Sequence, residues 1–195
     1  ISNPELANVP NNGVVVVVGA NGSGKSRLGH WIEHESGLPQ VHRLAAQKDL
    51  SLPSKTRPTT NAERSVRQLG VETDSSQSAR AHNRQYQGDP RVGMLRDYEH
   101  LINYLFAEQL ITSTKYRERA KTEHNWHLPD ETKLESVVRI WNSVFVNREL
   151  AIEPSEGTVK CNSVSTPESS DLYDGAMMSD GERVAFYLIG QCLVA

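Results

Sequence analysis

The stretch Val14–Ser26, VVVVVGANGSGKS, decides the fold that we expect for this chain. Five consecutive valines stand between Asn-Asn-Gly and a glycine, so they predict a short strand buried on both faces, as in a parallel sheet. A helix is expected to begin near Gly24–Lys25 and to run to about Ser36, where Gly37 stops it. A strand, a glycine-rich turn and a helix in this order predict an α/β fold.

The turn satisfies G-x-x-x-x-G-K-[ST], the phosphate-binding or Walker A pattern, with Gly19, Ala20, Asn21, Gly22, Ser23, Gly24, Lys25 and Ser26. Glycines allow consecutive backbone N–H groups to face a phosphate, and the helix N-terminus adds partial positive charge. Lys25 is expected to reach the β- and γ-phosphates, and Ser26 to offer its hydroxyl to Mg²⁺. Arg27 is expected to contact either the α-phosphate or solvent.

A second helix is expected to begin at Ser179-Asp180-Gly181-Glu182-Arg183. Ser179 is a good N-cap, and Glu182 three residues later completes a capping box. Together with GANGSGKS, this stretch resembles the signature motif of ABC-class ATPases, in which S-x-G-[EQ] begins a helix. The resemblance is to the soluble SMC-like and overcoming-lysogenisation-defect-like ATPases of that class, and it is confined to these two motifs.

The resemblance implies an ABC-type P-loop NTPase fold that binds ATP and Mg²⁺ and dimerises around the nucleotide. In that class the signature of one subunit caps the γ-phosphate held by the P-loop of the other. Ser179, Gly181 and Glu182 would therefore serve a nucleotide in trans, within a homodimer. The Asp180 carboxylate departs from the commonest form of the signature, and we expect it to point away from a phosphate.

The resemblance also implies a glutamine at a strand end that contacts Mg²⁺ and the attacking water. Gln47 follows a predicted second strand, Val41–Ala46, and is the candidate. Lys25 and Gln47 would then be the catalytic residues, with Ser26 and Gln47 at the metal.

The composition divides the chain into three parts. Residues 1–50 are the expected P-loop core, residues 51–147 a partly flexible and mainly helical insertion, and residues 148–195 the return to the core with the signature helix. Apolar spacing predicts helices near 94–124 and 134–146, with short strands over 149–153 and 158–162.

The formal net charge is -3, no apolar run approaches the roughly 20 residues of a membrane helix, and two cysteines form no CxxC pair. We therefore expect a soluble, cytoplasmic protein without a membrane partner. Lys115–Lys121, KYRERAK, reads as a solvated mixed-charge helix surface, with DNA contact as the open alternative.

His30 and His34 with Glu33 fit H-x-x-E-H, an inverted metalloprotease zinc pattern. No third ligand is evident, and the three residues lie on the helix that the phosphate-binding turn already explains. We therefore expect a solvated polar face, opposite the apolar face of that helix.

The class implied by the resemblance places a strand ending in Asp-Glu after the signature helix, and the 195 residues contain none there. We expect the intact protein to be longer or to be completed by a partner, and this chain alone to hydrolyse ATP poorly. The resemblance implies work in DNA maintenance or phage defence, with DNA or a nuclease as partner. Two alternatives stay open: a non-catalytic nucleotide sensor, and a P-loop small-molecule kinase whose lid would use Arg57, Arg64, Arg67, Arg80, Arg84 and Arg91.

Overall fold

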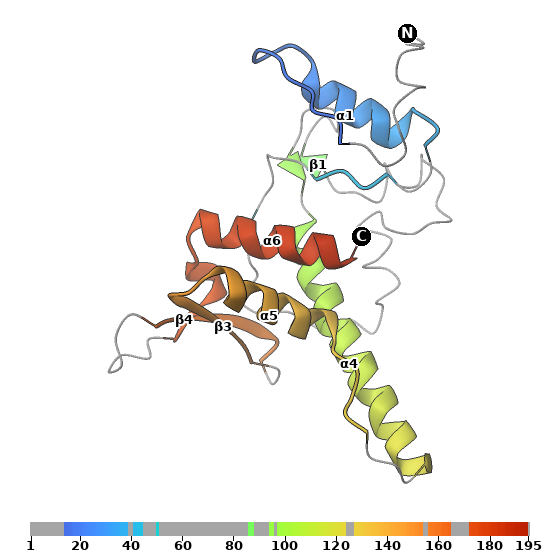
Figure 1. Cartoon of the computed structure of the whole chain (residues 1–195), viewed down its shortest axis with the longest axis vertical. Helices are drawn as coiled ribbons and strands as arrows, with labels where there is room; N and C mark the ends of the chain where they lie inside the picture. The colour runs from blue at the N-terminus through green and yellow to red at the C-terminus, as the bar shows by residue number, and fades with distance from the viewer. Residues whose placement is uncertain are drawn as a thin grey trace.

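The computed structural model describes residues 14–38, 41–44, 50, 97–123, 127–153, 156–164 and 172–194, and the backbone of 86–87 and 94–95. Within these ranges the chain forms a mixed α/β structure (Figure 1). Its four helices are α1 (Lys25–His34), α4 (Tyr98–Glu123), α5 (Lys133–Val144) and α6 (Asp180–Val194). One antiparallel sheet has the strand order β3 (Arg148–Glu153), β4 (Thr158–Ser163) and β5 (Leu172–Asp174). A second antiparallel pair consists of β1 (Tyr86–Gln87) and β2 (Met94–Leu95), and a 3₁₀ turn, Gly175–Met177, precedes α6.

One hydrophobic core joins α4, α5 and α6 to the β3–β5 sheet. Trp141 of α5 is fully buried in this core and stacks on Phe145, with 4.3 Å between the ring centroids. Tyr98, at the start of α4, meets Phe186 of α6 edge to face at 6.0 Å. Burial of these aromatic rings supplies much of the apolar area that drives the packing.

Both middle helices confirm the apolar spacing of the sequence. In α4 the first half carries all of the buried side chains except Ala120. Leu110 and Ile111 are exposed, and the second half projects from the body (Figure 1). In α5 the buried side chains lie on one face, and Thr132 with Glu135 forms a complete capping box at its start. The capping box satisfies N–H groups that the first turn of a helix leaves without partners.

The strands predicted near 149–153 and 158–162 are confirmed as the antiparallel pair β3–β4. Leu150 lies opposite Cys161 in the register, and both side chains face the core. The backbone N–H of Leu150 donates to Asn142 Oδ1 at 2.9 Å, which ties β3 to α5. The predicted boundary between the insertion, residues 51–147, and the returning core, residues 148–195, stays a prediction. In the structure α5 and β3, which lie on either side of this boundary, share one hydrophobic core.

The predicted buried strand Val14–Val18 is wrong for the structure described here. The five valines form no strand, and between 52% and 93% of each residue's surface is exposed. The parallel sheet that we expected around them is also missing from the described residues, whose sheets are antiparallel. A β-branched run becomes a strand only where a neighbouring strand pairs with its backbone, and none lies beside these valines within the described ranges.

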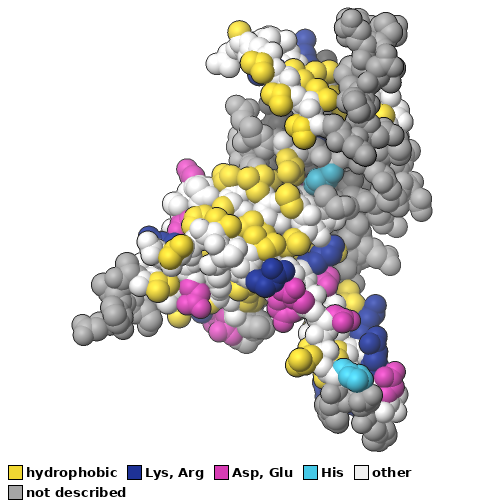
Figure 2. Space-filling model, viewed as in Figure 1, with side chains coloured by type: hydrophobic (Ala, Val, Ile, Leu, Met, Phe, Trp, Pro, Cys, Tyr) yellow, Lys and Arg dark blue, Asp and Glu magenta, His cyan; other side chains and the backbone are white. Residues whose placement is uncertain are grey.

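Hydrophobic side chains also reach the surface over α5 and α6, on the face that Figure 2 shows. Val144 of α5 is exposed, whereas Phe145, the next residue, packs against the core. No helix within the described ranges is both long and apolar enough to cross a lipid bilayer.

The contact between α4 and α6 depends on Gly190. A Cβ built at Gly190 would lie 2.8 Å from Leu101 Cδ2, whereas one built at Gly181, in the same helix, would meet nothing within 4 Å. We expect Gly181→Ala to raise the free energy of unfolding by up to about 1 kcal/mol, because alanine favours helix more than glycine. Gly190→Ala gains the same helix preference but overpacks a buried contact, at a cost of about 1–3 kcal/mol, so it should be net destabilising. Urea denaturation of both variants checks this, and equal stabilisation by both would contradict the packing described.

Candidate functional site

The Gly19–Ser26 turn leads directly into α1 through left-handed backbone. Gly22 has φ 83° and Gly24 has φ 93°, a region in which side chains with a Cβ are strained. Gly24 is the N-cap of α1 and supplies no side-chain acceptor. The leading N–H groups of α1 therefore have no side-chain cap, which is the arrangement that binds anions at helix N-termini.

The ammonium group of Lys25 lies over this turn. Its Nζ donates to the carbonyl oxygens of Gly19 and Ala20, both at 2.7 Å, and lies 3.5 Å from Ser23 Oγ. A Cβ at Gly19 would come within 2.6 Å of Ser23 Oγ, so a larger residue there would require the Ser23 side chain to move. The result is a compact loop with an exposed cation at its centre.

The turn borders an open hollow of about 650 Å³, lined by residues 21–27. This volume lies in the range of small-molecule sites, roughly 300–1,000 Å³. Ser26 and Arg27 are exposed at its edge. The structure thus brings Asn21–Arg27 together at one helix N-terminus, with Gly19 and Ala20 completing the turn.

The strand predicted over Val41–Ala46 is wrong for its described residues, since 41–44 form no strand. Gln47 lies outside the described residues, so its place at the metal and at the attacking water stays a prediction. In the described part of the chain, no group of three or more His, Cys, Asp or Glu side chains is arranged to hold a metal ion. Ser26 is the predicted magnesium ligand that lies on the described turn.

The start of α6 confirms the expected capping box. Glu182 Oε2 accepts from the backbone N–H of Ser179 at 2.7 Å and from its hydroxyl at 2.8 Å, and the N–H of Glu182 lies 3.3 Å from Ser179 Oγ. The Asp180 side chain is 91% exposed and pairs with Arg183 at 3.0 Å. A Cβ at Gly181 would meet nothing within 4 Å, so this helix end is open to an approaching group.

Two residues that the sequence did not single out hold Glu182 in place. Its Oε1 accepts from Arg148 Nε at 3.2 Å and from the Tyr173 hydroxyl at 3.1 Å. Burial by itself would raise the pKa of Glu182, but the hydrogen bonds from Ser179, Tyr173 and Arg148 lower it below its ordinary value. Arg148 and Tyr173 carry no local motif, because they reach Glu182 only through the folding of β3–β5.

The two predicted halves of the nucleotide site do not meet within one chain. Figure 1 shows the turn before α1 and the start of α6 in separate parts of the molecule. Ser179, Gly181 and Glu182 therefore do not contact the chain's own Gly19–Ser26 turn, and their action in trans stays a prediction.

The expected solvated polar face of α1 is wrong. Only 1% of the Glu33 side chain and 5% of the His34 side chain are exposed, and His34 Nε2 lies 3.2 Å from Glu33 Oε2. Glu33 also accepts from Arg43 Nε at 2.7 Å. The pairing of Glu33 with Arg43, in the segment after α1, offsets the cost of removing the carboxylate from water. The periodicity of the sequence does not reveal such a partner.

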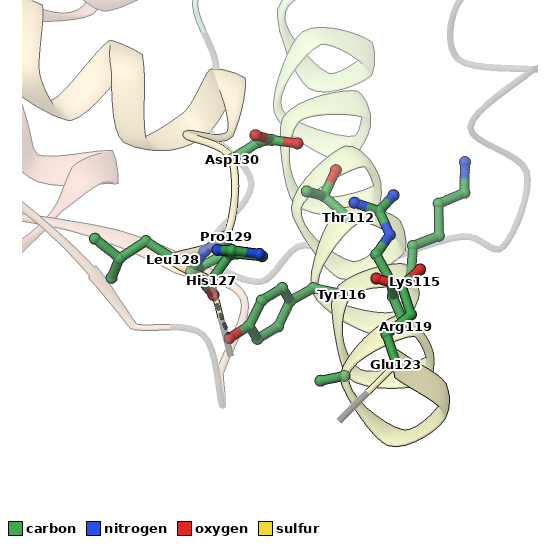
Figure 3. A pocket seen from close by; sticks show the side chains of 10 residues that line it. Thr112, Lys115, Tyr116, Arg119, Glu123, His127, Leu128, Pro129 and Asp130 are labelled. Atoms are coloured by element: carbon green, nitrogen blue, oxygen red, sulfur yellow. Dashed lines mark hydrogen bonds between the residues drawn. The ribbon is translucent and has the colours of Figure 1, made fainter. Parts of the chain in front are cut away.

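A second hollow, of about 290 Å³, lies between the projecting half of α4 and residues 127–130 (Figure 3). The Tyr116 hydroxyl donates to the carbonyl of His127 at 2.7 Å, and both residues line this hollow. Its cationic side chains, from Lys115 and Arg119, are matched by two acidic ones, from Glu123 and Asp130. The charged side chains that line this hollow are thus of both signs, and DNA contact along Lys115–Lys121 stays a prediction.

The chain matches no protein-family model, no curated protein and no solved structure.

Glu182 makes stability depend on pH. Because its folded-state pKa lies below the ordinary value of 4.5, its contribution is present above that value and is lost as pH falls through the folded-state pKa. We expect Glu182→Gln to lower stability at neutral pH and to flatten the decline below pH 4.5, as urea midpoints measured across pH 2–7 would show. Glu131→Gln is the control: its carboxylate pairs with Arg139 at the exposed surface, so its effect should be smaller and should fade in salt. An unchanged pH profile in Glu182→Gln would contradict the role given to these hydrogen bonds.

Proposed function

We propose that the chain is the nucleotide-binding part of an ABC-type ATPase, with the phosphates of ATP held by the Gly19–Ser26 turn. The observation that carries the proposal is the combination of two left-handed glycines, an uncapped α1 N-terminus and a lysine over the turn. Backbone N–H groups, helix dipole and ammonium all favour a bound anion at the same place.

Lys25 is proposed to move from the loop carbonyls to the phosphates when ATP binds. Its present acceptors at Gly19 and Ala20 are neutral carbonyl oxygens. A phosphate oxygen is a stronger acceptor, since hydrogen bonds between charged groups are shorter and roughly twice as strong. Ser26 would then supply a hydroxyl ligand to the Mg²⁺ that accompanies ATP.

The Ser179 end of α6 is proposed to close the site of a second copy. This end is exposed, carries a small hydroxyl residue and a glycine, and keeps Asp180 engaged with Arg183. A helix N-terminus with small side chains can approach a γ-phosphate closely. Two copies would thus enclose ATP between the turn of one and Ser179 of the other.

Hydrolysis is proposed for the intact protein, with Gln47 orienting the attacking water and Lys25 stabilising the transferred charge. Opening and closing of the dimer would then perform the work, in DNA maintenance or phage defence, with DNA or a nuclease as partner. The kinase alternative depends on arginines between 57 and 91, which lie outside the described residues, so no observation favours it.

Lys25→Ala tests the phosphate site. We expect it to weaken MgATP binding about 10- to 100-fold, because a hydrogen bond to a charged group contributes about 1.5–3 kcal/mol. Isothermal titration measures the affinity, and Lys121→Ala, which removes an exposed lysine of α4, is the control and should bind normally. Equal affinity in the Lys25 and Lys121 variants would refute the proposal.

Ser179→Asp tests the second copy. Aspartate is as good an N-cap as serine, but at this position it loses the hydroxyl bond to Glu182 and places a second carboxylate beside it. We therefore expect the variant to fold with a loss of about 1.5–3 kcal/mol of stability, while its charge would face the γ-phosphate. We expect this variant of the intact protein to remain monomeric with a non-hydrolysable ATP analogue, under conditions in which the unaltered protein forms dimers. Light scattering measures the mass, and Ser179→Ala separates the causes, since it loses the cap but adds no charge. Dimer formation by the aspartate variant would contradict contact in trans.

A further inference from the structure

The segment that follows α1, residues 41–44, is held against α1 by Arg43. Its Nε donates to the buried Glu33 carboxylate at 2.7 Å. A Cβ at Gly29 would lie 3.4 Å from Arg43 Cδ, so the aliphatic part of Arg43 packs against the middle of α1. Because breaking a buried ion pair is strongly unfavourable, α1 and this segment behave as one unit.

The same segment contacts α6 through Gln191. His42 Nε2 lies 2.8 Å from Gln191 Oε1, and Gln191 Nε2 donates to Asp97 Oδ2 at 3.0 Å. Gln191 and Asp97 are both 0% exposed. The amide of Gln191 therefore bridges the segment after α1 and the residue that precedes α4.

These contacts determine which nitrogen of His42 carries a hydrogen. Asp97 Oδ2 accepts from Gln191 and also from the Tyr187 hydroxyl at 2.8 Å. Gln191 must then turn its NH₂ group to Asp97 and its oxygen to His42. Because the Gln191 oxygen can only accept, Nε2 of His42 carries the hydrogen and donates it.

We infer that Gln191 is a positioning residue, which couples ATP binding at the Gly19–Ser26 turn to the orientation of α6. The inference rests on the proposed function. α1 begins at that turn and is joined to Gln191 through Arg43 and His42. Gln191 follows Ser179 by 12 residues, which is about 18 Å along a helix, so a small rotation at Gln191 displaces the Ser179 end. Removing the His42–Gln191 hydrogen bond would also weaken the binding of ATP, because α1 and its turn would then be held less firmly in the position that binds the phosphates.

A double-mutant cycle with MgATP tests the coupling. His42→Ala removes one hydrogen bond and leaves the contact between α6 and Asp97, whereas Gln191→Leu removes both bonds at similar volume. We expect each single variant to bind ATP at least about fivefold more weakly, the lower end of common coupling energies. The double variant should bind ATP no more weakly than Gln191→Leu does, since both changes remove the same His42–Gln191 hydrogen bond.

Asn142→Ala provides the matched control, because it removes the 2.9 Å bond from Leu150 N that joins β3 to α5, away from α1. Its loss of stability should leave the ATP affinity unchanged, which separates coupling from general destabilisation. Unaltered affinity in His42→Ala, or single effects that multiply in the double variant, would overturn the inference alone. Failure of the unaltered chain to bind ATP would instead overturn the proposed function, and the inference with it.

Discussion

The buried carboxyl group of Asp97 constrains how the helices can pack. A polar group removed from water costs several kcal/mol unless hydrogen bonds replace its hydration. Tyr187 and Gln191 supply those bonds, and both lie in the second half of α6. The start of α4 therefore packs against the part of α6 that contains Tyr187 and Gln191. This packing places Leu101 against Gly190 and brings Tyr98 into contact with Phe186. The sheet and α5 complete the core on the other side.

The two helix ends proposed for the nucleotide differ in how their own N–H groups are satisfied. α1 begins after a glycine without a side-chain cap, so its anion-binding capacity is available to a phosphate. α6 is already capped by Ser179 and Glu182, and Glu182 is held further by Arg148 and Tyr173. The N-terminus of α1 is therefore suited to bind a phosphate by itself. The N-terminus of α6 is suited to contact a phosphate whose negative charge another group has already neutralised in part.

The exposed valines before the turn show that a local sequence pattern does not by itself form a strand. Their side chains have high strand propensity, and the turn that follows has the geometry expected from its glycines. A strand, however, is formed by hydrogen bonds to a neighbouring strand, and five valines in a row cannot supply that neighbour. A helix closes its backbone hydrogen bonds within one segment, so α4, α5 and α6 could be predicted from their own residues.

The amino-acid sequence by itself determined the helices, the capping box at Ser179, the glycine turn with Lys25 and the two segments that become β3 and β4, because each of these depends on residues within one short segment. Only the tertiary structure decided that Glu33 and His34 are buried, that Val14–Val18 are exposed, and that Arg148 and Tyr173 hold Glu182. It also decided the contact of His42 with Gln191, across 149 positions of the chain. The burial of a polar side chain depends on whether a distant partner reaches it, and no periodicity in the sequence records that partner.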